Sequence, residues 1–168
     1  REREREEEMT VTDVQRDHEA LTMTITAEFN VSPERVWQLW EDPRQLERWW
    51  GPPVYPATVT AHDLTPGGSV SYHMTGPGGD QPRGWWRVLK VEAPHRLEFE
   101  NGLADASGAP NPDVPFMIVR VTISALSEGV TRMAVESAYP TLAAMEMFMS
   151  MGMEEGMKGA MSQIDGLL

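Results

Sequence analysis

LTMTITAEFNVSPERVW, residues 21–37, places a strand pattern directly before the start of a helix. Apolar and polar residues alternate over residues 20–29, which is typical of a half-buried strand. The apolar face of that strand consists of Leu21, Met23, Ile25 and Phe29. Ser32 then offers an N-cap, Pro33 suits the first helical position, and Glu34 begins an acidic first turn. The stretch therefore predicts a strand that leads into a helix.

The helical pattern continues to a point where the chain changes direction. Apolar residues follow at helical spacing, namely Val36, Trp37, Leu39 and Trp40. Asp42 and Pro43 end this helix and start another over residues 44–50, which Gly51-Pro52-Pro53 stops. The sequence thus predicts two short helices joined at an angle.

Strand patterns follow. We expect strands at residues 56–63, 68–75, 84–92, 95–101, 115–126 and 130–138, separated by turns rich in Gly and Pro. Because the connections are short and contain no helix, neighbouring strands should pair antiparallel. Together with the first strand they make a curved antiparallel sheet of seven strands.

The last element is expected to be one long helix from Pro140 to Leu168, because no proline interrupts it. Small residues four positions apart would form a smooth ridge on this helix, namely Gly152, Gly156 and Ala160. Glycine costs about 1 kcal/mol inside a helix relative to alanine. The ridge therefore predicts that another backbone or a ligand approaches closely.

The order of strand, two short helices, six strands and terminal helix matches the α+β helix-grip fold. The stretches VSPERVW (31–37), WWGP (49–52), DLTPGG (63–68) and APHRL (93–97) resemble the family related to the activator of heat-shock-protein-90 ATPase. That family belongs to the START-like, polyketide-cyclase-like superfamily, also called SRPBCC. The resemblance covers residues 20–168 and implies a cavity between sheet and terminal helix. Met153 and Met157 stand where the family more often carries tryptophan.

The composition limits the classes of partner. Lys and Arg total 14 and Asp and Glu total 26, which gives a net charge of −12. This charge disfavours binding to nucleic acid or to anionic lipid. The chain has no cysteine and no run of about 18 apolar residues, so we expect neither thiolate chemistry nor a membrane span. We expect a cytoplasmic protein without metal or cofactor, with residues 1–19 as a disordered charged tail and residues 20–168 as the domain.

Candidate catalytic groups are sparse. The histidines are not at metal-ligand spacing, and alternation places His73 on the solvent side of its strand. No nucleophile elbow or phosphate-binding loop is present. Asp63, Glu98 and Glu100 lie in or near strands, where a buried carboxylate could act as a general base. These patterns favour a binding protein over an enzyme.

The expected pocket is apolar. Its predicted lining comes from the helices and turn (Trp40, Trp49, Trp50, Tyr55), the sheet (Tyr72, Met74, Trp86, Phe99, Met117, Val119) and the terminal helix (Met145, Met149, Met153, Met157). Flexible methionines suit varied apolar shapes, and a tryptophan N–H or Tyr55 would orient the ligand. The loop at residues 102–114 is a candidate lid.

Three functions remain open at this point. The first is binding of a small hydrophobic or aromatic molecule in the cavity. The second is a cyclase or hydrolase that uses the same cavity. The third is chaperone-associated protein interaction, through the acidic surface or through Met147, Phe148 and Met151, whose exposure would also provide a homodimer patch.

Overall fold

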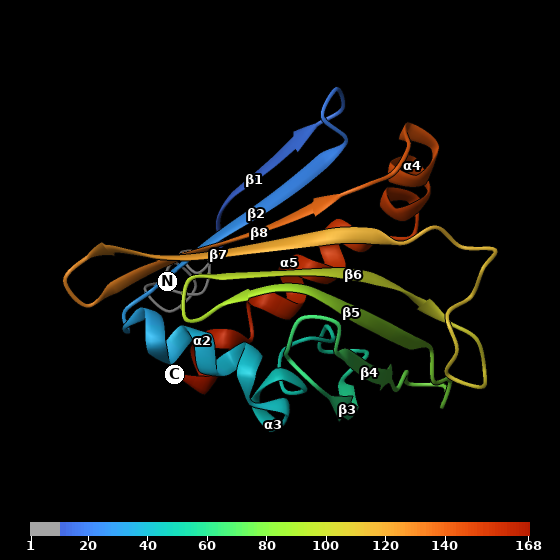
Figure 1. The fold of residues 1–168 in the computed structure, drawn as a ribbon, viewed down its shortest axis with the longest axis horizontal. Helices are drawn as coiled ribbons and strands as arrows, with labels where there is room; N and C mark the ends of the chain where they lie inside the picture. Colours follow the sequence, from blue (N-terminus) through green and yellow to red (C-terminus); the bar gives the residue numbers. More distant parts are fainter. Residues whose placement is uncertain (1–10) are drawn as a thin grey trace.

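One antiparallel sheet of eight strands, in the order β1-β2-β8-β7-β6-β5-β4-β3, organises the chain (Figure 1). The computed structural model describes residues 11–168. The strands are β1 (Val11–Asp17), β2 (Thr22–Phe29), β3 (Ala57–His62), β4 (Ser69–Met74), β5 (Arg83–Glu92), β6 (Arg96–Ala104), β7 (Met117–Ser127) and β8 (Val130–Ala138). The expected α+β class and antiparallel pairing are confirmed, but the count of seven strands is wrong.

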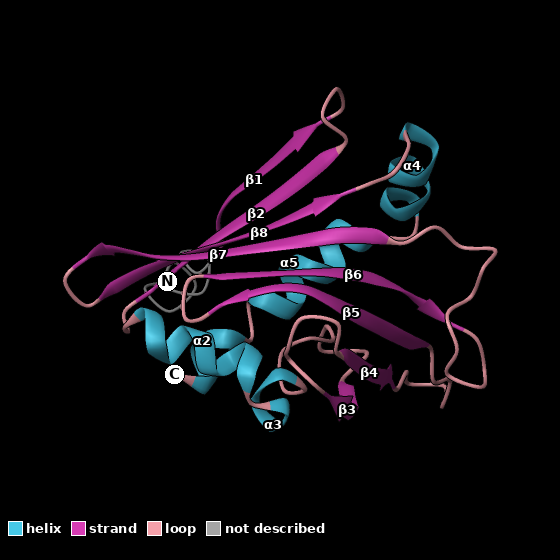
Figure 2. Cartoon of the chain, in the orientation of Figure 1, coloured by secondary structure: helices cyan, strands magenta, loops and turns pink. Residues whose placement is uncertain are grey.

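The helical elements are α2 (Pro33–Glu41), α3 (Pro43–Leu46), α4 (Leu142–Ser150), α5 (Met153–Met161) and η1 (Ile164–Leu167). Figure 2 shows α5 behind β6 and β7, with α2 and α3 toward one end and α4 toward the other. The buried side of α5 belongs to the same apolar cluster as the inner residues of the sheet. The helices therefore cover one face of the sheet.

The opening stretch folds as its pattern predicts. On β2, every second residue from Met23 to Phe29 is buried. The Ser32 hydroxyl accepts a hydrogen bond from the Arg35 amide, with Pro33 in the first turn. Asp42 ends α2 and caps α3, accepting from the Arg44 amide at 2.9 Å. Helix α3 is shorter than expected, because residues 47–50 form turns.

The additional strand, β1, lies in the region predicted to be a disordered tail. Val14 pairs with Ile25 of β2, and Val11 and Val14 pack against the buried cluster. The two valines are three residues apart, and a register shift between Val11 and Asp13 pairs them with Ala27 and Ile25, which share one face of β2. The prediction of a tail is therefore wrong for residues 11–19, and residues 1–10 lie outside the described residues.

The single long terminal helix is also a wrong prediction, because α4 and α5 are separated at Gly152. Gly152 has φ of +81°, a left-handed conformation that glycine adopts at little cost and that ends a helix. Glu154 and Glu155 occupy the first turn of α5, where acidic side chains interact favourably with the helix dipole. A Cβ added at Gly156 would meet no atom of residues 11–168 within 4 Å, so no close backbone is found there.

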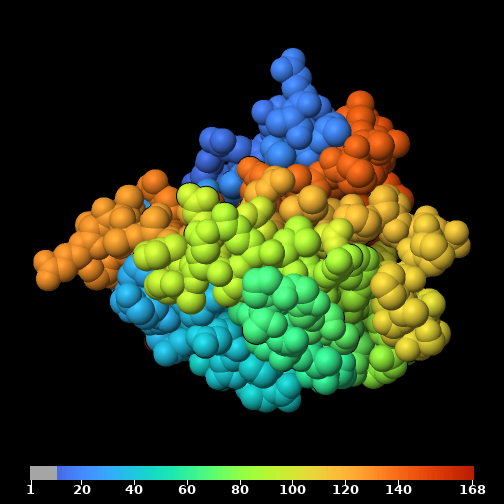
Figure 3. Space-filling view, viewed as in Figure 1, coloured from blue at the N-terminus to red at the C-terminus, as the bar shows by residue number. Residues whose placement is uncertain are grey.

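Both outermost strands are irregular. A bulge or irregularity lies between Val11 and Asp13 on β1 and between Val59 and Ala61 on β3. The space-filling view shows the β7–β8 turn projecting from the body on one side and the β1–β2 turn on another (Figure 3). Register shifts also occur on inner strands, between Val88 and Lys90 on β5 and between Ala125 and Ser127 on β7.

Polar contacts fix both ends of α5. At its start, Arg16 of β1 donates to Glu154 Oε2 at 2.6 Å, and Arg16 Nε lies against Glu154 Oε1. Beyond its end, Gln163 donates to the Gly51 carbonyl at 2.7 Å and Arg35 donates to the Leu167 carbonyl at 2.7 Å. Helix α5 is thus tied to the sheet edge and to the α2–α3 corner.

Candidate functional site

Five aromatic rings fill the space between the α2–α3 corner and the sheet. This aromatic cluster consists of Trp40, Trp49, Trp50, Trp86 and Phe99. Trp86 and Phe99 stack with ring centroids 3.9 Å apart, whereas Trp40 meets Trp49 edge to face at 4.8 Å. Trp50 meets Trp86 at 4.8 Å and 77°. Such edge-to-face and offset contacts stabilise aromatic pairs beyond the burial of their area.

The indole N–H groups of this cluster differ in their partners. Trp49 Nε1 donates to the Leu39 carbonyl at 3.0 Å, and Trp40 Nε1 donates to Met133 Sδ at 3.3 Å. The Nε1 atoms of Trp50 and Trp86 are buried and have no hydrogen-bond partner among the described residues. A buried donor without an acceptor costs about 1–3 kcal/mol. Both N–H groups lie near the Tyr72 hydroxyl, whose pKa they lower.

Both indoles lie beside a buried tyrosine. The ring of Tyr72 is 6.1 Å from that of Trp50 and crosses the backbone of Gly84, where any Cβ would overlap its hydroxyl. Asn101 Nδ2 donates to Tyr72 Oη at 3.1 Å and to the Trp85 carbonyl at 3.1 Å. Burial raises the pKa of Tyr72, and the nearby N–H groups of Trp50, Asn101 and Trp86 offset part of that rise. The phenol therefore stays protonated at neutral pH.

We refer to Trp50, Tyr72, Trp86 and Asn101 as the donor cluster. Asn101 was not among the predicted lining residues. Its signal in the sequence is a polar residue in the inward-facing series Leu97, Phe99, Asn101 of β6, and it is one of three buried polar or charged side chains among residues 11–168.

Methionines occupy the other end of the interior. The methionine end consists of Met145, Met149, Met153 and Met157 on α4 and α5, together with Tyr139 and Phe148. Met145 is fully buried and Met157 is 8% exposed, whereas Met149 and Met153 are half-buried and pack against the core. Met153 Sδ accepts from the Tyr139 hydroxyl at 3.6 Å. Both ends belong to one continuous buried cluster.

The remaining predicted lining residues fall into two groups. Met117 and Val119 are buried on β7, and Met74 is half-buried at the end of β4. The Tyr55 hydroxyl instead donates to Asp80 Oδ2 at 2.8 Å, and this contact raises the pKa of Tyr55. Tyr55 is thus engaged with the loop between β4 and β5. A lining role for these residues stays a prediction.

The proposed exposed patch is not formed as expected. Phe148 is buried against Tyr139, with ring centroids 5.8 Å apart, and Met147 is half-buried. Met151 is 58% exposed. Because the helix breaks at Gly152, α4 has a different direction from that of a continuous helix. The face of α4 that is buried therefore differs from the predicted one.

The candidate acids and bases lie outside the buried interior. Glu98 accepts from Arg120 at 3.1 Å, Glu100 faces Arg87, and Asp63 accepts from Thr65 in a turn. His73 is half-buried, and its Nδ1 atom is buried without a partner. Within residues 11–168, the buried polar or charged side chains are those of Asn101, Thr131 and Ser137. One carboxylate does reach the margin of the interior: Glu154 Oε1 is buried, and its side chain pairs with Arg16 and lies near Tyr139.

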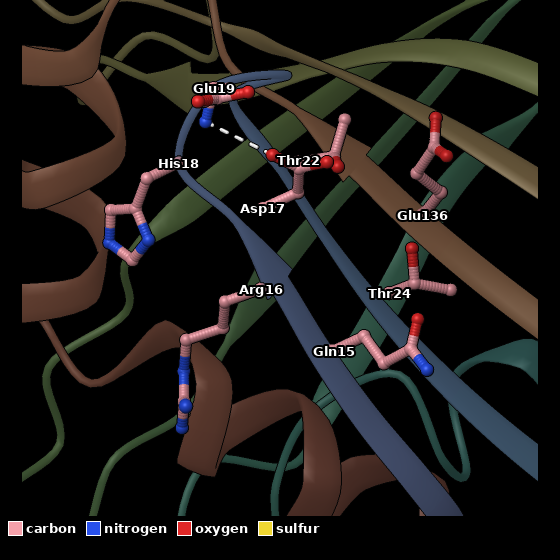
Figure 4. Close-up of a pocket in the computed structure, with 8 residues that line it drawn as sticks. All are labelled: Gln15, Arg16, Asp17, His18, Glu19, Thr22, Thr24 and Glu136. Atoms are coloured by element: carbon pink, nitrogen blue, oxygen red, sulfur yellow. Dashed lines mark hydrogen bonds between the residues drawn. The ribbon is translucent and has the colours of Figure 1, made fainter.

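A hollow of about 570 Å³ lies outside the interior, on the β1–β2 hairpin and β8. Figure 4 shows Thr24, Gln15 and Glu136 on one side of the strands, while Arg16 and His18 project to the other. Asp17 accepts from the Glu19 amide at 3.0 Å and holds the turn. The described part of the chain offers no group of three or more residues able to hold a metal.

The sheet with its inner helical layer is an SRPBCC-like α+β fold. The chain belongs to the family described as "Activator of Hsp90 ATPase homolog 1-like protein", whose sequence profile matches residues 30–168. This confirms the resemblance inferred from the sequence motifs. No protein with a curated description matches the chain.

Several solved structures are similar over nearly the whole chain. Protein Ms6760 from Mycobacterium smegmatis is 46% identical, with a TM-score of 0.87 over 94% of this chain and 96% of that one. A protein from Arthrobacter aurescens is 49% identical, with a TM-score of 0.89 over 93% and 90%. A protein from Staphylococcus epidermidis is 24% identical, with a TM-score of 0.80 over 94% and 93%, and supports the fold alone.

Among residues 11–168, no helix combines the length and the apolar character that crossing a bilayer requires.

Proposed function

We propose that the chain binds a small hydrophobic or aromatic molecule between the inner face of the sheet and helices α4 and α5. The observation that carries this proposal is the packing of Met149 and Met153. Both side chains contact the buried cluster and yet remain partly exposed. An apolar molecule that replaces water on these side chains gains about 25 cal/mol per Å² of apolar surface buried.

The methionine end is suited to binding an apolar molecule because its side chains can repack. Met has three rotatable bonds and a polarizable sulfur, so it adapts to different apolar shapes. Helix α4 ends at Ser150, and the chain restarts as α5 at Met153, directly after Gly152. The break allows α4 to shift while the polar contacts of Arg16 and Gln163 hold α5.

The alternatives have weaker support. A cyclase or hydrolase needs an acid or base at the ligand, and the buried polar side chains of the described interior are Asn101, Thr131 and Ser137. The protein-interaction function would use Met147, Phe148 and Met151 as one exposed patch, but Phe148 is buried. Location in the cytoplasm, the absence of nucleic-acid and membrane partners, and a homodimer stay predictions.

The test is binding of N-phenyl-1-naphthylamine, a neutral probe whose fluorescence rises in apolar surroundings. We expect the full chain to increase its fluorescence and the double variant Met153→Trp, Met157→Trp to lose the increase, because the indoles would occupy the space. The control is Leu142→Trp, which adds an indole at a side chain that is 46% exposed. Circular dichroism would verify that each variant is folded.

Two results would contradict the proposal. The first is a wild-type chain that leaves the probe unchanged. The second is unaltered probe binding by the folded double variant, which would place any apolar site elsewhere. If the double variant does not fold, Met153→Phe alone should still weaken binding, because the ring would occupy space beside this half-buried position.

A further inference from the structure

We propose that Met153 is a site of reversible oxidation by a hydroperoxide, and that the Tyr139 hydroxyl holds the sulfoxide formed there. Oxidation then places a polar group at the methionine end and weakens binding of an apolar ligand. The modification site stands by itself, whereas its effect on binding rests on the proposed function.

The methionines around the break between α4 and α5 differ in how far a solute can reach their sulfur atoms. They stand at every second position, namely Met145, Met147, Met149, Met151 and Met153. Met145 is fully buried, Met151 is 58% exposed, and the other three are half-buried against the core. Because a peroxide has to reach the thioether, we expect Met145 to be protected and the other four to be open to attack.

Met153 differs from its neighbours because a hydrogen-bond donor faces its sulfur. The Tyr139 hydroxyl donates to Met153 Sδ at 3.6 Å. Within residues 11–168, no such donor reaches the sulfur of Met149 or Met151. Burial raises the pKa of Tyr139 to about 12, so the phenol keeps its proton at neutral pH. The donor is therefore present under the conditions in which oxidation would occur.

The chemistry of the step strengthens this contact. The sulfur attacks the terminal oxygen of the hydroperoxide, and the O–O bond breaks. The sulfur loses two electrons and keeps the oxygen as a sulfoxide, while the proton of that oxygen passes to the leaving group, which departs as an alcohol or water. A thioether sulfur is a weak acceptor, whereas a sulfoxide is polar and its oxygen accepts strongly. Tyr139 therefore binds the oxidised side chain more strongly than the reduced one.

The start of α5 is held in place beside Tyr139. Met153 is the first residue of α5, and the next residue, Glu154, pairs with Arg16 of β1. The charge of Glu154 also acts on the Tyr139 phenol, which agrees with their closeness. Oxidation of Met153 thus makes this part of the proposed binding region polar while the new oxygen has a partner.

The first experiment locates the modification. The full chain is treated with increasing hydrogen peroxide, and tandem mass spectrometry follows each methionine. We expect Met151 to be oxidised first, Met153 next and Met133 last, and methionine sulfoxide reductases to restore Met153. Met133 is the matched control, because it also accepts a hydrogen bond, from Trp40 at 3.3 Å, but is fully buried. A Met153 that stays reduced until Met133 is oxidised would overturn the proposal.

The second experiment tests the role of the Tyr139 hydroxyl. The fall in melting temperature on peroxide treatment is measured for the wild-type chain and for Tyr139→Phe. Since the variant lacks one hydrogen bond to the sulfoxide, we expect its fall to be larger by about 2–4 °C. In a Met153→Leu background, which cannot form this sulfoxide, Tyr139→Phe should leave the fall unchanged. Equal falls in the first pair, with Met153 oxidised in both chains, would show that the hydroxyl does not hold the sulfoxide.

The third experiment measures the effect on binding of N-phenyl-1-naphthylamine. Two chains are compared, Met149→Leu and the double variant Met149→Leu, Met153→Leu, so that oxidation of half-buried Met149 does not contribute. Peroxide should weaken binding by the first chain about fivefold or more, because a polar oxygen loses water when an apolar molecule covers it. The double variant should keep its affinity.

The outcomes separate this inference from the proposed function. If the untreated chains do not bind the probe, the proposed function fails, and the mass spectra and melting temperatures still decide the modification site. If the untreated chains bind and oxidation of Met153 leaves the affinity unchanged, the proposed function stands and control of binding by oxidation is overturned.

Discussion

The aromatic cluster and the methionine end share one buried interior, but they differ in how tightly their side chains are constrained. Trp40, Trp49 and Phe99 are fully buried, and the cluster rings contact one another at fixed angles. Met149 and Met153 contact the same interior and remain half-buried. The comparison indicates that the rings mainly stabilise the fold, whereas the methionines can rearrange around a ligand.

The largest expected effect is on stability at the aromatic cluster. Trp40→Ala should lower the free energy of unfolding by about 3–5 kcal/mol, because it leaves a large cavity among packed rings. Met149→Ala should cost less than about 2 kcal/mol, because a half-buried side chain gives up less contact. Urea denaturation monitored by circular dichroism measures both values. Equal losses at the two sites would contradict the comparison.

The second prediction concerns the break that separates α4 from α5. Gly152→Ala should destabilise the chain by about 1–2 kcal/mol, because alanine is strained at a left-handed position. Gly156→Ala should instead stabilise it by up to about 1 kcal/mol, because this residue is inside α5 and the added methyl meets no described atom within 4 Å. If both substitutions stabilised the chain equally, the segment would be one continuous helix.

The third prediction concerns the alkaline stability of the methionine end. Burial raises the pKa of Tyr139 to about 12 from the ordinary value of 10.0, with a smaller contribution from the charge of Glu154. Because the folded pKa exceeds the unfolded pKa, the stabilising contribution of the neutral phenol is complete below pH 10 and is lost between pH 10 and 12. Thermal unfolding across this range should show a decline in melting temperature.

The control for this decline is Tyr139→Phe, which should flatten it in part. Some pH dependence should remain, because burial also raises the pKa of Tyr72. An identical decline in the variant would show that Tyr139 is not the titrating group.

The sequence predicts most of the sheet because its strands follow simple physical rules. Strands β2 and β8 bury every second residue, so alternation locates them to within about two residues. The cap at Ser32 and the corner at Asp42 follow from side chains that bond to nearby amides. Local chemistry is sufficient for these features.

The features that were missed depend on tertiary packing. Strand β1 has few apolar residues, and it becomes a strand because β2 offers a free edge and Arg16 pairs with Glu154 far along the chain. The contacts of Asn101, Trp50 and Trp86 with Tyr72 form only because β4, β5 and β6 are paired in the folded sheet. Periodicity cannot show which buried donor lacks an acceptor. The predicted lining could therefore list tryptophans but could not distinguish Trp49 from Trp50.

The bulges on β1 and β3 have a consequence for self-association. Each lies on an outermost strand, where unpaired amide and carbonyl groups could otherwise template a second chain. A bulge interrupts that regular row of groups, so copies of the protein should not extend the sheet end to end into fibrils.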